Sequence, residues 1–342
     1  MKIFHIKSSD CTLEMENRFA DLIAAFAALG ISQRVMMSAS NRLAAHCAAL
    51  SIPCDIQKFS GMFDLRTPQA GQRLADKFDP HIIQTHSFDS GMVAAKIKGR
   101  GLRLGFAGDP QPDGKKHSDI VLSAGYGQTG KKMEFNVFPV APLVGNGHAA
   151  IAPASRADFD TPENKPLIGA MVDLNGQYGL AAPLGAIREI PELHFWIIGR
   201  GEGKDALLEK ARKQAVYDRV HFIEAGDDTN WPSLLKALDL CIVPRRKTGV
   251  DRLTLEAWSC GVCVLSGMPE GDTPVTHGVN GWLTQGSDAL KWREALKRIL
   301  PDAALRQKLA LAGQEEYTKS YAAGKVVRSY LQSYETALRV KA

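Results

Sequence analysis

The sequence predicts an α/β protein built from two Rossmann-like domains, and three observations lead to this prediction. The chain has 342 residues, which is more than one domain usually holds. Short apolar runs alternate with amphipathic stretches through both halves, as in parallel sheets covered by helices. Between 144 and 165 the alternation lapses into a segment rich in Gly, Ala, Pro and Asp, which is typical of a linker. The expected division is a first domain over 1–146, a linker over 147–164, a second domain over 165–318 and a final helix over 319–342.

The first half begins with a short apolar strand and an amphipathic helix. In that helix Phe19, Leu22, Ile23 and Phe26 recur at helical spacing, and Gly30 follows the last turn. The same two patterns then repeat along the half. The expected strands are 2–6, 34–37, 52–56, 81–86, 102–106 and 120–123, and the expected helices are 14–29, 41–50, 66–78 and 90–97.

The second half restarts the alternation with a strand at 167–171. A helix over 180–190 is expected with Pro183 in its first turn, where proline is tolerated. Further strands are expected at 194–199, 220–223, 240–243 and 262–265, and further helices at 205–214, 231–238, around Glu256, and at 292–300, 305–312 and 314–338. Two successive passages from strand to loop to helix between 238 and 282 place loops and a helix start at the carboxyl edge of the sheet. α/β proteins bind nucleotides at this edge.

Composition limits the function classes. The net charge is +5, and 45% hydrophobic with 23% charged residues is ordinary for a globular protein. No apolar run approaches the roughly 18 residues of a membrane span, and the start lacks a signal peptide, so we expect a cytoplasmic protein. No aromatic-basic motif or zinc finger indicates nucleic-acid binding. Basic residues cluster at 96–103, which fits either an ordinary solvated surface or peripheral contact with an anionic membrane.

Six cysteines are present, and Cys260 and Cys263 form the only C-x2-C pair. No second pair stands at zinc-site spacing, and the flanking residues are those of an apolar strand. We therefore expect free thiols in the core and no metal site.

Five stretches of the second half carry a family resemblance when taken in order. They are HFWIIGRGEGKDALLEKA, DRVHFIEAG, LLKALDLCIVP, LTLEAWSCGVCVLSG and THGVNGWL. The second half is thereby similar to the glycosyl transferases group 1, or glycosyltransferase family 4, well over 167–300 and weakly in the first half. The resemblance implies the GT-B fold, in which two Rossmann-like domains face each other across a cleft. It also implies that the final helix packs back on the first domain.

The resemblance implies a site for a nucleotide diphosphate-sugar donor. Glu256 would hold the ribose through its two carboxylate oxygens. The turn of Thr248, Gly249, Val250, Asp251 and Arg252 would bind the diphosphate through backbone N–H groups at a helix start. Gly201 lies in a glycine-containing loop near the donor, and Ile223 and Glu224 lie against the base. His86, at the end of an expected strand, would face the transferred sugar.

The chain departs from the family pattern in the diphosphate site. Thr248 stands where the family has the first of two glutamates, and Ala170 and Asn175 stand where it has an arginine and a lysine. Arg245 and Arg246 in the neighbouring loop could supply the missing positive charge and complete the catalytic set with His86.

Three hypotheses stay open. The first is a retaining, metal-independent glycosyltransferase of the hexosyltransferase type, with no cofactor besides its UDP-, GDP- or ADP-sugar donor. Its acceptor would be a saccharide or a lipid-linked molecule, in the assembly of surface polysaccharide or lipopolysaccharide. The second is a catalytically degenerate GT-B protein that acts as a binding or scaffold partner. The third is another two-domain α/β enzyme, such as a nucleotide-sugar epimerase.

Overall fold

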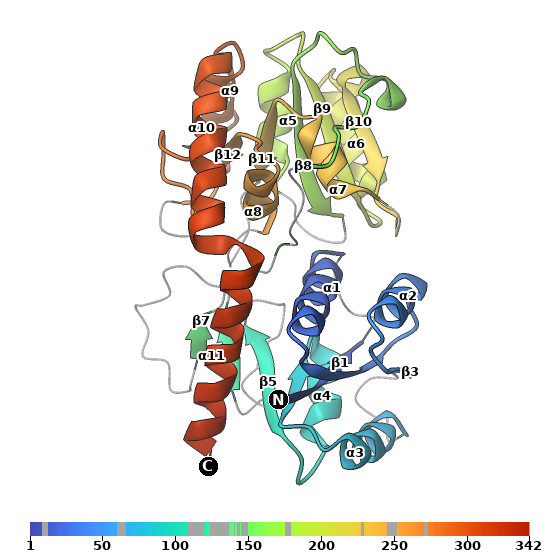
Figure 1. Cartoon of the computed structure of the whole chain (residues 1–342). Helices are drawn as coiled ribbons and strands as arrows, with labels where there is room; N and C mark the ends of the chain where they lie inside the picture. The colour runs from blue at the N-terminus through green and yellow to red at the C-terminus, as the bar shows by residue number, and fades with distance from the viewer. Residues whose placement is uncertain are drawn as a thin grey trace. The chain divides into compact units, whose positions relative to one another are not determined.

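The chain folds into two compact units, which are described one at a time. Unit 1 comprises residues 1–143 and 323–342, and unit 2 comprises 144–322. The computed structural model describes residues 1–8, 13–59, 66–107, 120–123, 137–139, 141, 144, 150–174, 179–226, 229–244, 252–269 and 273–341. Each unit contains a parallel sheet flanked by helices, so the predicted α/β class is confirmed (Figure 1).

Unit 1 is built on a sheet that has seven strands within the described residues, in the order β3-β2-β1-β4-β5-β6-β7. The strands are β1 (Lys2–Lys7), β2 (Ser32–Met37), β3 (Cys54–Ile56), β4 (Ile82–Thr85), β5 (Leu102–Ala107), β6 (Ile120–Ser123) and β7 (Val137–Pro139). The helices are α1 (Leu13–Ala28), α2 (Asn41–Ala49), α3 (Arg66–Phe78), α4 (Phe88–Ala95) and α11 (Ala323–Lys341). Because β1 and β4 are neighbouring parallel strands, residues that follow β1 and β4 come together at the carboxyl edge of the sheet.

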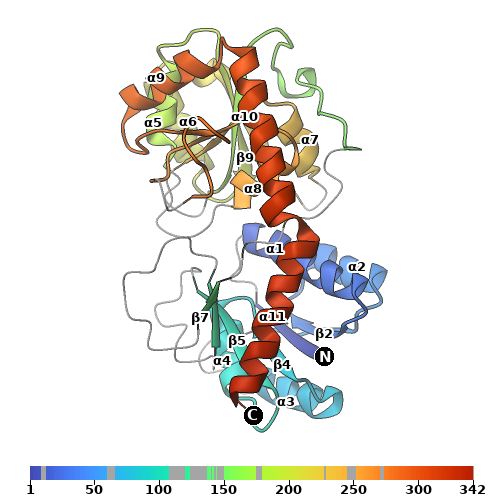
Figure 2. The ribbon, with the colours of Figure 1, turned by 60° about the vertical axis from the view of Figure 1, so that its left-hand side comes forward.

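Both faces of the unit 1 sheet are covered. On one face α1 packs with α2 and α11, and on the other lie α3 and α4. Figures 1 and 2 both show α11, the last helix of the chain, running along the strands of unit 1. Its buried side chains include Val326, Val327, Tyr330 and Tyr334, which pack on strands β1, β4 and β5. The C-terminal helix therefore completes the hydrophobic core of unit 1.

Unit 2 has a second parallel sheet, with six strands in its described part and the order β10-β9-β8-β11-β12-β13. The strands are β8 (Leu167–Asp173), β9 (His194–Arg200), β10 (Val220–Glu224), β11 (Leu240–Val243), β12 (Val264–Ser266) and β13 (Trp282–Leu283). The helices are α5 (Ala181–Ile187), α6 (Lys204–Lys213), α7 (Trp231–Lys236), α8 (Arg252–Ser259), α9 (Ala289–Ile299) and α10 (Ala303–Glu316). Short 3-10 helices cover Ala157–Phe159 and Tyr217–Arg219, and a π-helix covers Tyr317–Tyr321.

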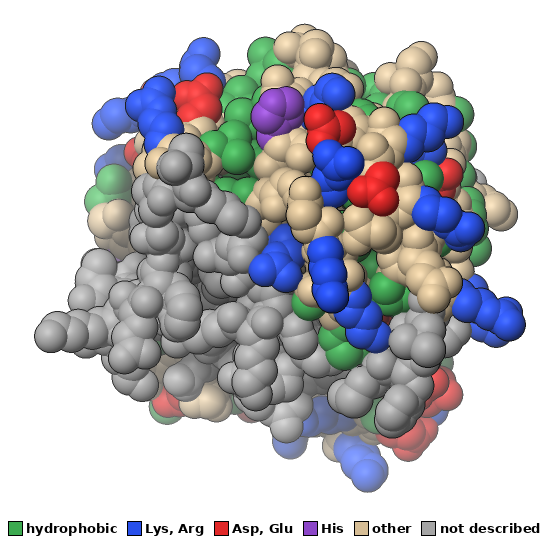
Figure 3. Space-filling model, turned by 90° about the horizontal axis from the view of Figure 1, so that it is seen from below, with side chains coloured by type: hydrophobic (Ala, Val, Ile, Leu, Met, Phe, Trp, Pro, Cys, Tyr) green, Lys and Arg blue, Asp and Glu red, His purple; other side chains and the backbone are tan. Residues whose placement is uncertain are grey.

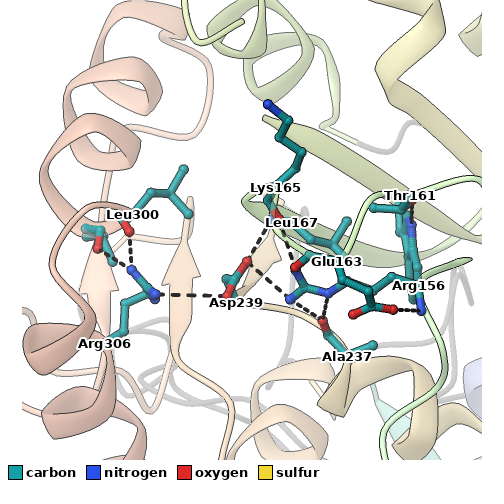
Figure 4. A network of polar contacts seen from close by, with 11 residues as sticks. Arg156, Thr161, Glu163, Lys165, Leu167, Ala237, Asp239, Leu300 and Arg306 are labelled. Carbon is teal, nitrogen blue, oxygen red and sulfur yellow. Dashed lines mark hydrogen bonds and ion pairs between the residues drawn. The ribbon is translucent and has the colours of Figure 1, made fainter. Parts of the chain in front are cut away.

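The segment before β8 packs on the rest of unit 2 through a half-buried arginine, Arg156. The Arg156 guanidinium donates to the Ala237 carbonyl over 2.7 and 2.9 Å and to the Lys165 carbonyl over 3.0 Å (Figure 4). It also lies 3.2 Å from the Asp239 carboxylate, which accepts from the Leu167 N–H over 2.8 Å. Residues 150–166 are thus fastened to the start of β8 and β11, although their composition alone reads as a linker.

The structure corrects three details of the expected element list. Strands β7 and β13 were not expected, because runs of three and two residues carry no periodic signal. The prediction of a single helix over 314–338 was wrong. Its apolar periodicity continues through 322, but Ala322 has φ −53° and ψ 137°, which is not helical. The helix therefore breaks there, and α11 begins at Ala323.

Candidate functional site

Glu256 is the predicted site residue that the structure places most firmly. It lies in α8, all of whose residues are buried, and its carboxylate Oε1 accepts from Arg252 Nε over 2.6 Å. The two side chains are one helical turn apart and are 6% and 8% exposed, for Arg252 and Glu256 respectively. The arginine that the sequence assigned to the diphosphate turn is therefore bonded to the residue assigned to the ribose.

The packing around α8 explains why this pair is fixed. Leu255 and Trp258 are fully buried on the same helix, and Trp258 Nε1 donates to the Asn280 carbonyl over 3.0 Å. Ser259 Oγ donates to the Glu256 carbonyl over 2.7 Å. A carboxylate held this way presents a fixed acceptor, and a buried ion pair of this kind keeps its orientation without a ligand.

The loop before α8 lies outside the described residues. It contains the predicted Arg245, Arg246, Thr248, Gly249, Val250 and Asp251, so their roles stay predictions. Asn175 also lies outside. Ala170 is described, and its methyl group is fully buried in β8, where it cannot contact a phosphate.

The predicted glycine loop follows β9 and opens α6. Gly201 has φ +134°, a backbone conformation that side chains disfavour. A Cβ on the neighbouring Gly199 would stand 2.0 Å from the Val172 carbonyl oxygen, so only glycine fits there. Gly203 N–H donates to the Leu174 carbonyl over 2.9 Å. These contacts tie the loop to the carboxyl end of β8, the edge at which the sequence predicted the donor site.

Ile223 and Glu224 end β10 at the same edge of the sheet. Ile223 is buried, whereas the Glu224 side chain is 74% exposed and lies 3.9 Å from Lys204 Nζ. Lys204 also stands over the Phe222 ring, 4.5 Å from its centroid. Glu224 and the neighbouring Lys204–Phe222 pair take their places from the pairing of β10 with β9. Buried hydrogen bonds do not fix the exposed Glu224 side chain.

His86 of unit 1 directly follows β4 and is buried. Its Nε2 lies 3.1 Å from Nδ1 of His5, and its ring meets the Phe19 ring edge-on at 4.6 Å. Its backbone N–H donates to the Ile6 carbonyl over 3.0 Å. Burial lowers the pKa of His86 well below 6.5, and the positive charge of Arg18 and Lys7 lowers it further. His86 is therefore a neutral imidazole held at the carboxyl edge of the sheet.

Serine hydroxyls surround this edge of unit 1. The Ser8 N–H after β1 donates to Ser87 Oγ over 3.1 Å, and the two hydroxyls are also hydrogen-bonded. The Ser87 N–H donates to Ser90 Oγ over 2.9 Å in a capping box that starts α4. Nearby, Lys7 Nζ pairs with Glu16 Oε1 at 3.1 Å. The strand ends that flank His86 are thus locked by polar contacts.

The cysteine pair, possible metal-ligand groups and the hydropathy of the helices were the other sequence features to compare with the described residues. Cys260 and Cys263 are free, and burial raises the pKa of each thiol to about 12, which makes them unreactive. No group of three His, Cys, Asp or Glu side chains within the described ranges could hold a metal ion. Among the helices of the described part, none is both long and apolar enough to cross a bilayer.

Two hollows of unit 2 are lined by residues other than the predicted donor-site residues. One of about 500 Å³ is lined by Trp282, His277 and Lys291, among others. The second, of about 550 Å³, is lined by Asp239, Cys260 and Arg306 among others. Neither is lined by Glu256 or Gly201, so neither is the predicted site.

Sequence reasoning missed two residues that organise the candidate site, His5 and Gln33. His5 falls inside the expected strand 2–6 and Gln33 stands just before the expected strand 34–37, and a single polar residue in or beside an apolar run gives no sign of a partner on another strand. The Arg252–Glu256 pair was within reach of the sequence, since an arginine four residues before a glutamate on a helix predicts contact.

Comparison with known proteins supports the family resemblance. Residues 167–302 match the model of the family described as glycosyl transferases group 1. The lipopolysaccharide core biosynthesis glycosyltransferase LpsE of Rhizobium meliloti is 28% identical over 204 residues, which cover 59% of this chain and 58% of LpsE. A D-inositol 3-phosphate glycosyltransferase of Salinispora tropica is 34% identical over 135 residues, covering 39% of this chain and 27% of that protein. The chain therefore spans about half or less of the length of these curated relatives.

Solved structures resemble the chain over its full length. A glycosyltransferase from Rickettsia africae has a TM-score of 0.82 at 13% identity and covers 98% of both chains. Anabaena HepE, in complex with UDP and glucose, has a TM-score of 0.79 at 16% identity and covers 98% of this chain and 100% of its own. At such identities the likeness shows the fold alone, which is GT-B, as the sequence predicted.

Proposed function

We propose that this chain, whose residues 167–302 belong to the glycosyl transferases group 1 family, transfers a sugar from a nucleotide diphosphate-sugar to an acceptor hydroxyl. The proposed reaction retains the anomeric configuration and needs no metal. The relatives favour an acceptor in lipopolysaccharide or another surface polysaccharide, because LpsE is a lipopolysaccharide core biosynthesis glycosyltransferase. They favour a UDP-sugar donor, because HepE was crystallised with UDP-glucose and with UDP.

The observation that carries the proposal is the buried Arg252–Glu256 pair in α8. A carboxylate taken out of water needs a strong partner, and the arginine supplies one at Oε1. We propose that the carboxylate, oriented by this bond, accepts from the ribose hydroxyls. The helix start and the loop before it would then receive the diphosphate.

Charge on the leaving diphosphate is the demanding part of such a reaction. Ala170 cannot neutralise it, so we propose that Arg245 and Arg246 supply the cations together with backbone N–H groups of 248–251. Gly201 would line the donor site, and Ile223 and Glu224 would lie beside the base. In unit 1, His86 would contact the transferred sugar as a neutral hydrogen-bonding group.

The experiment that tests the activity is a screen of sugar release from UDP-, GDP- and ADP-sugars, each with the nucleotide product measured. Release of one nucleotide above the level of the Glu256→Gln variant supports the proposal. Tight nucleotide binding with no release for any donor would instead support the degenerate scaffold reading, and absence of both would exclude a donor site.

We also propose that unit 1 makes peripheral contact with anionic lipid. Arg73, Lys77, Lys96 and Lys98 are exposed on α3 and around the loop before β5. Figure 3 shows lysine and arginine side chains gathered on the face seen from below, with a few acidic side chains among them. Asp76 and Asp79, the acidic residues at the end of α3, both pair with Arg100. Several cations near one surface favour an anionic bilayer by about 1 kcal/mol each.

A further inference from the structure

A row of buried polar side chains crosses three neighbouring strands of unit 1. Gln33 lies on β2, His5 lies on β1, and His86 follows β4. Their exposed fractions are 5%, 0% and 2%. Gln33 Oε1 lies 3.1 Å from His5 Nε2, and His5 Nδ1 lies 3.1 Å from His86 Nε2. Such a row inside an apolar core is costly unless every bond is made, so the direction of each bond is constrained.

The direction is set at the far end of the row. Gln33 Nε2 donates to the Ile23 carbonyl over 2.9 Å, and a carbonyl oxygen can only accept. The amide nitrogen of Gln33 must therefore face Ile23, and its oxygen must face His5. That oxygen also only accepts, so His5 carries its proton on Nε2. His5 Nδ1 is then the acceptor, and His86 must donate from Nε2.

The surroundings keep this arrangement neutral. Burial lowers the pKa of His5 to about 3, although its bond to Gln33 opposes the shift, and burial also lowers that of His86. The rings of Phe19 and Phe26 lie 5.8 and 6.3 Å from the His5 ring. The charged neighbours that act on His86 are Arg18 and Lys7, both of which oppose a second positive charge. A neutral imidazole in such a row has one donor and one acceptor nitrogen.

We propose that Gln33 and His5 are positioning residues that fix His86 in the Nε2–H tautomer, so that its Nδ1 is the acceptor nitrogen. This inference rests on the proposed contact between His86 and the transferred sugar. It deepens that role, because His86 then acts toward a sugar hydroxyl as a neutral acceptor and not as an acid. The tautomer of a histidine is set by the bond that its other nitrogen makes.

The direct test is nitrogen NMR of the protein with ¹⁵N-labelled histidine. Two-bond proton–nitrogen spectra distinguish a protonated ring nitrogen from a bare one, and the His5→Gln and His86→Asn variants assign the two signals. In the unmodified protein both rings should show a protonated Nε2 and a bare Nδ1 throughout pH 6 to 8. A protonated Nδ1 on His86, or an imidazolium in this range, overturns the proposal whatever the enzyme's activity.

A variant of Gln33 tests whether the hydrogen bonds from Gln33 through His5 to His86 set the tautomer of His86. Gln33→Met keeps the length of the side chain but removes the oxygen that accepts from His5, so His5 is released and the His86 signal should change to the other tautomer or to a mixture. Gln84→Met is the matched control. Gln84 is equally buried, pairs in register with His5 and accepts from Tyr334 instead, so its loss should leave the His86 tautomer unchanged.

Kinetics separate this inference from the proposed function. With an active donor, Gln33→Met should lower kcat roughly 10- to 100-fold, the loss seen when a residue that orients a metal-binding histidine is removed, while Gln84→Met should not. An altered tautomer with unchanged turnover would overturn the positioning role. If no donor turns over in the unmodified protein, the proposed function fails, and the NMR result still decides whether Gln33 and His5 set the tautomer.

Discussion

At the scale of single residues, the Arg252–Glu256 pair both stabilises the core of unit 2 and contains the residue proposed to bind the donor ribose. Both side chains are almost completely buried, and each charge would be costly to bury without the opposite charge of its partner. The sequence could predict Glu256 as a site residue by resemblance. It could not predict that the carboxylate is already engaged, because burial of both partners depends on how α8 packs in unit 2.

We expect Glu256→Ala to lower the free energy of unfolding by about 3–5 kcal/mol, because it strands the Arg252 charge in the core. The double variant Arg252→Met, Glu256→Leu should recover most of that loss, since an apolar pair of similar volume removes the buried charges. Denaturant titration measures both. The surface pair Lys291–Glu294 is the control, and Glu294→Ala should cost less than about 1 kcal/mol. A cost for Glu256→Ala as small as that of the control would contradict the account.

The buried histidines predict a pH dependence of stability. The pKa of His5 is lowered from 6.5 to about 3 in the folded chain, so the unfolded chain binds a proton there first as the pH falls. The stability from the neutral form is fully present above pH 6.5 and is lost progressively between pH 6.5 and about 3. Each such histidine contributes a slope of about 1.4 kcal/mol per pH unit in that window.

The measurement is the unfolding free energy of the unmodified protein and of His5→Gln at pH 7, 6 and 5. The variant should lose stability less steeply on acidification, because one titrating group has been removed. Parallel curves for the two proteins would show that His5 is not held neutral in the fold.

At the scale of elements, the strands and helices follow from periodicity to different degrees. Runs such as 194–199 and 240–243 are predictable, because a short, almost continuous apolar run between turn residues is typical of a strand buried on both faces of a parallel sheet. Strand β13 is not, since Trp282 and Leu283 join the sheet only by pairing with Leu265 and Ser266. The helix break at Ala322 is also hidden, because apolar spacing continues on both sides of it.

Helix α11 makes its contribution to the core of unit 1 and can be tested there. Tyr334 is fully buried against that core, and its hydroxyl donates to Gln84 Oε1. Truncation to alanine should destabilise unit 1 by about 3–5 kcal/mol, as for other large buried side chains. Hydrogen exchange should therefore speed up in β4 and β5 but not in β8 and β9. The exposed Glu335→Ala on the same helix is the control and should change neither. Unchanged exchange in β4 would mean that α11 does not stabilise the unit 1 sheet.

At the scale of the whole molecule, the two units have different proposed roles: unit 2 binds the nucleotide, and exposed cations of unit 1 contact anionic lipid. The cations of 73–98 in unit 1 are exposed, and we expect them to bind anionic lipid. Replacing Lys77, Lys96 and Lys98 by glutamate should reduce sedimentation with vesicles that contain phosphatidylglycerol by at least about tenfold, because each cation contributes about 1 kcal/mol. High salt should have the same effect.

A matched charge change in unit 2 controls for net charge. The combined substitutions Lys213→Glu, Lys297→Glu and Lys308→Glu alter three exposed residues, of α6, α9 and α10. This variant should bind the vesicles nearly as well as the unmodified protein. Equal losses from the two sets of substitutions would show that binding follows overall charge and that no lipid-facing surface exists on unit 1.

The central claim is that unit 2 binds a nucleotide diphosphate through a site that contains Glu256. Calorimetric titration of the unmodified protein and of Glu256→Gln with UDP, GDP and ADP tests it most directly. The account predicts saturable binding of one nucleotide, with UDP favoured, and an affinity at least about tenfold weaker in the variant, equal to about 1.4 kcal/mol. The absence of binding for all three nucleotides, or equal affinity in the two proteins, would contradict it.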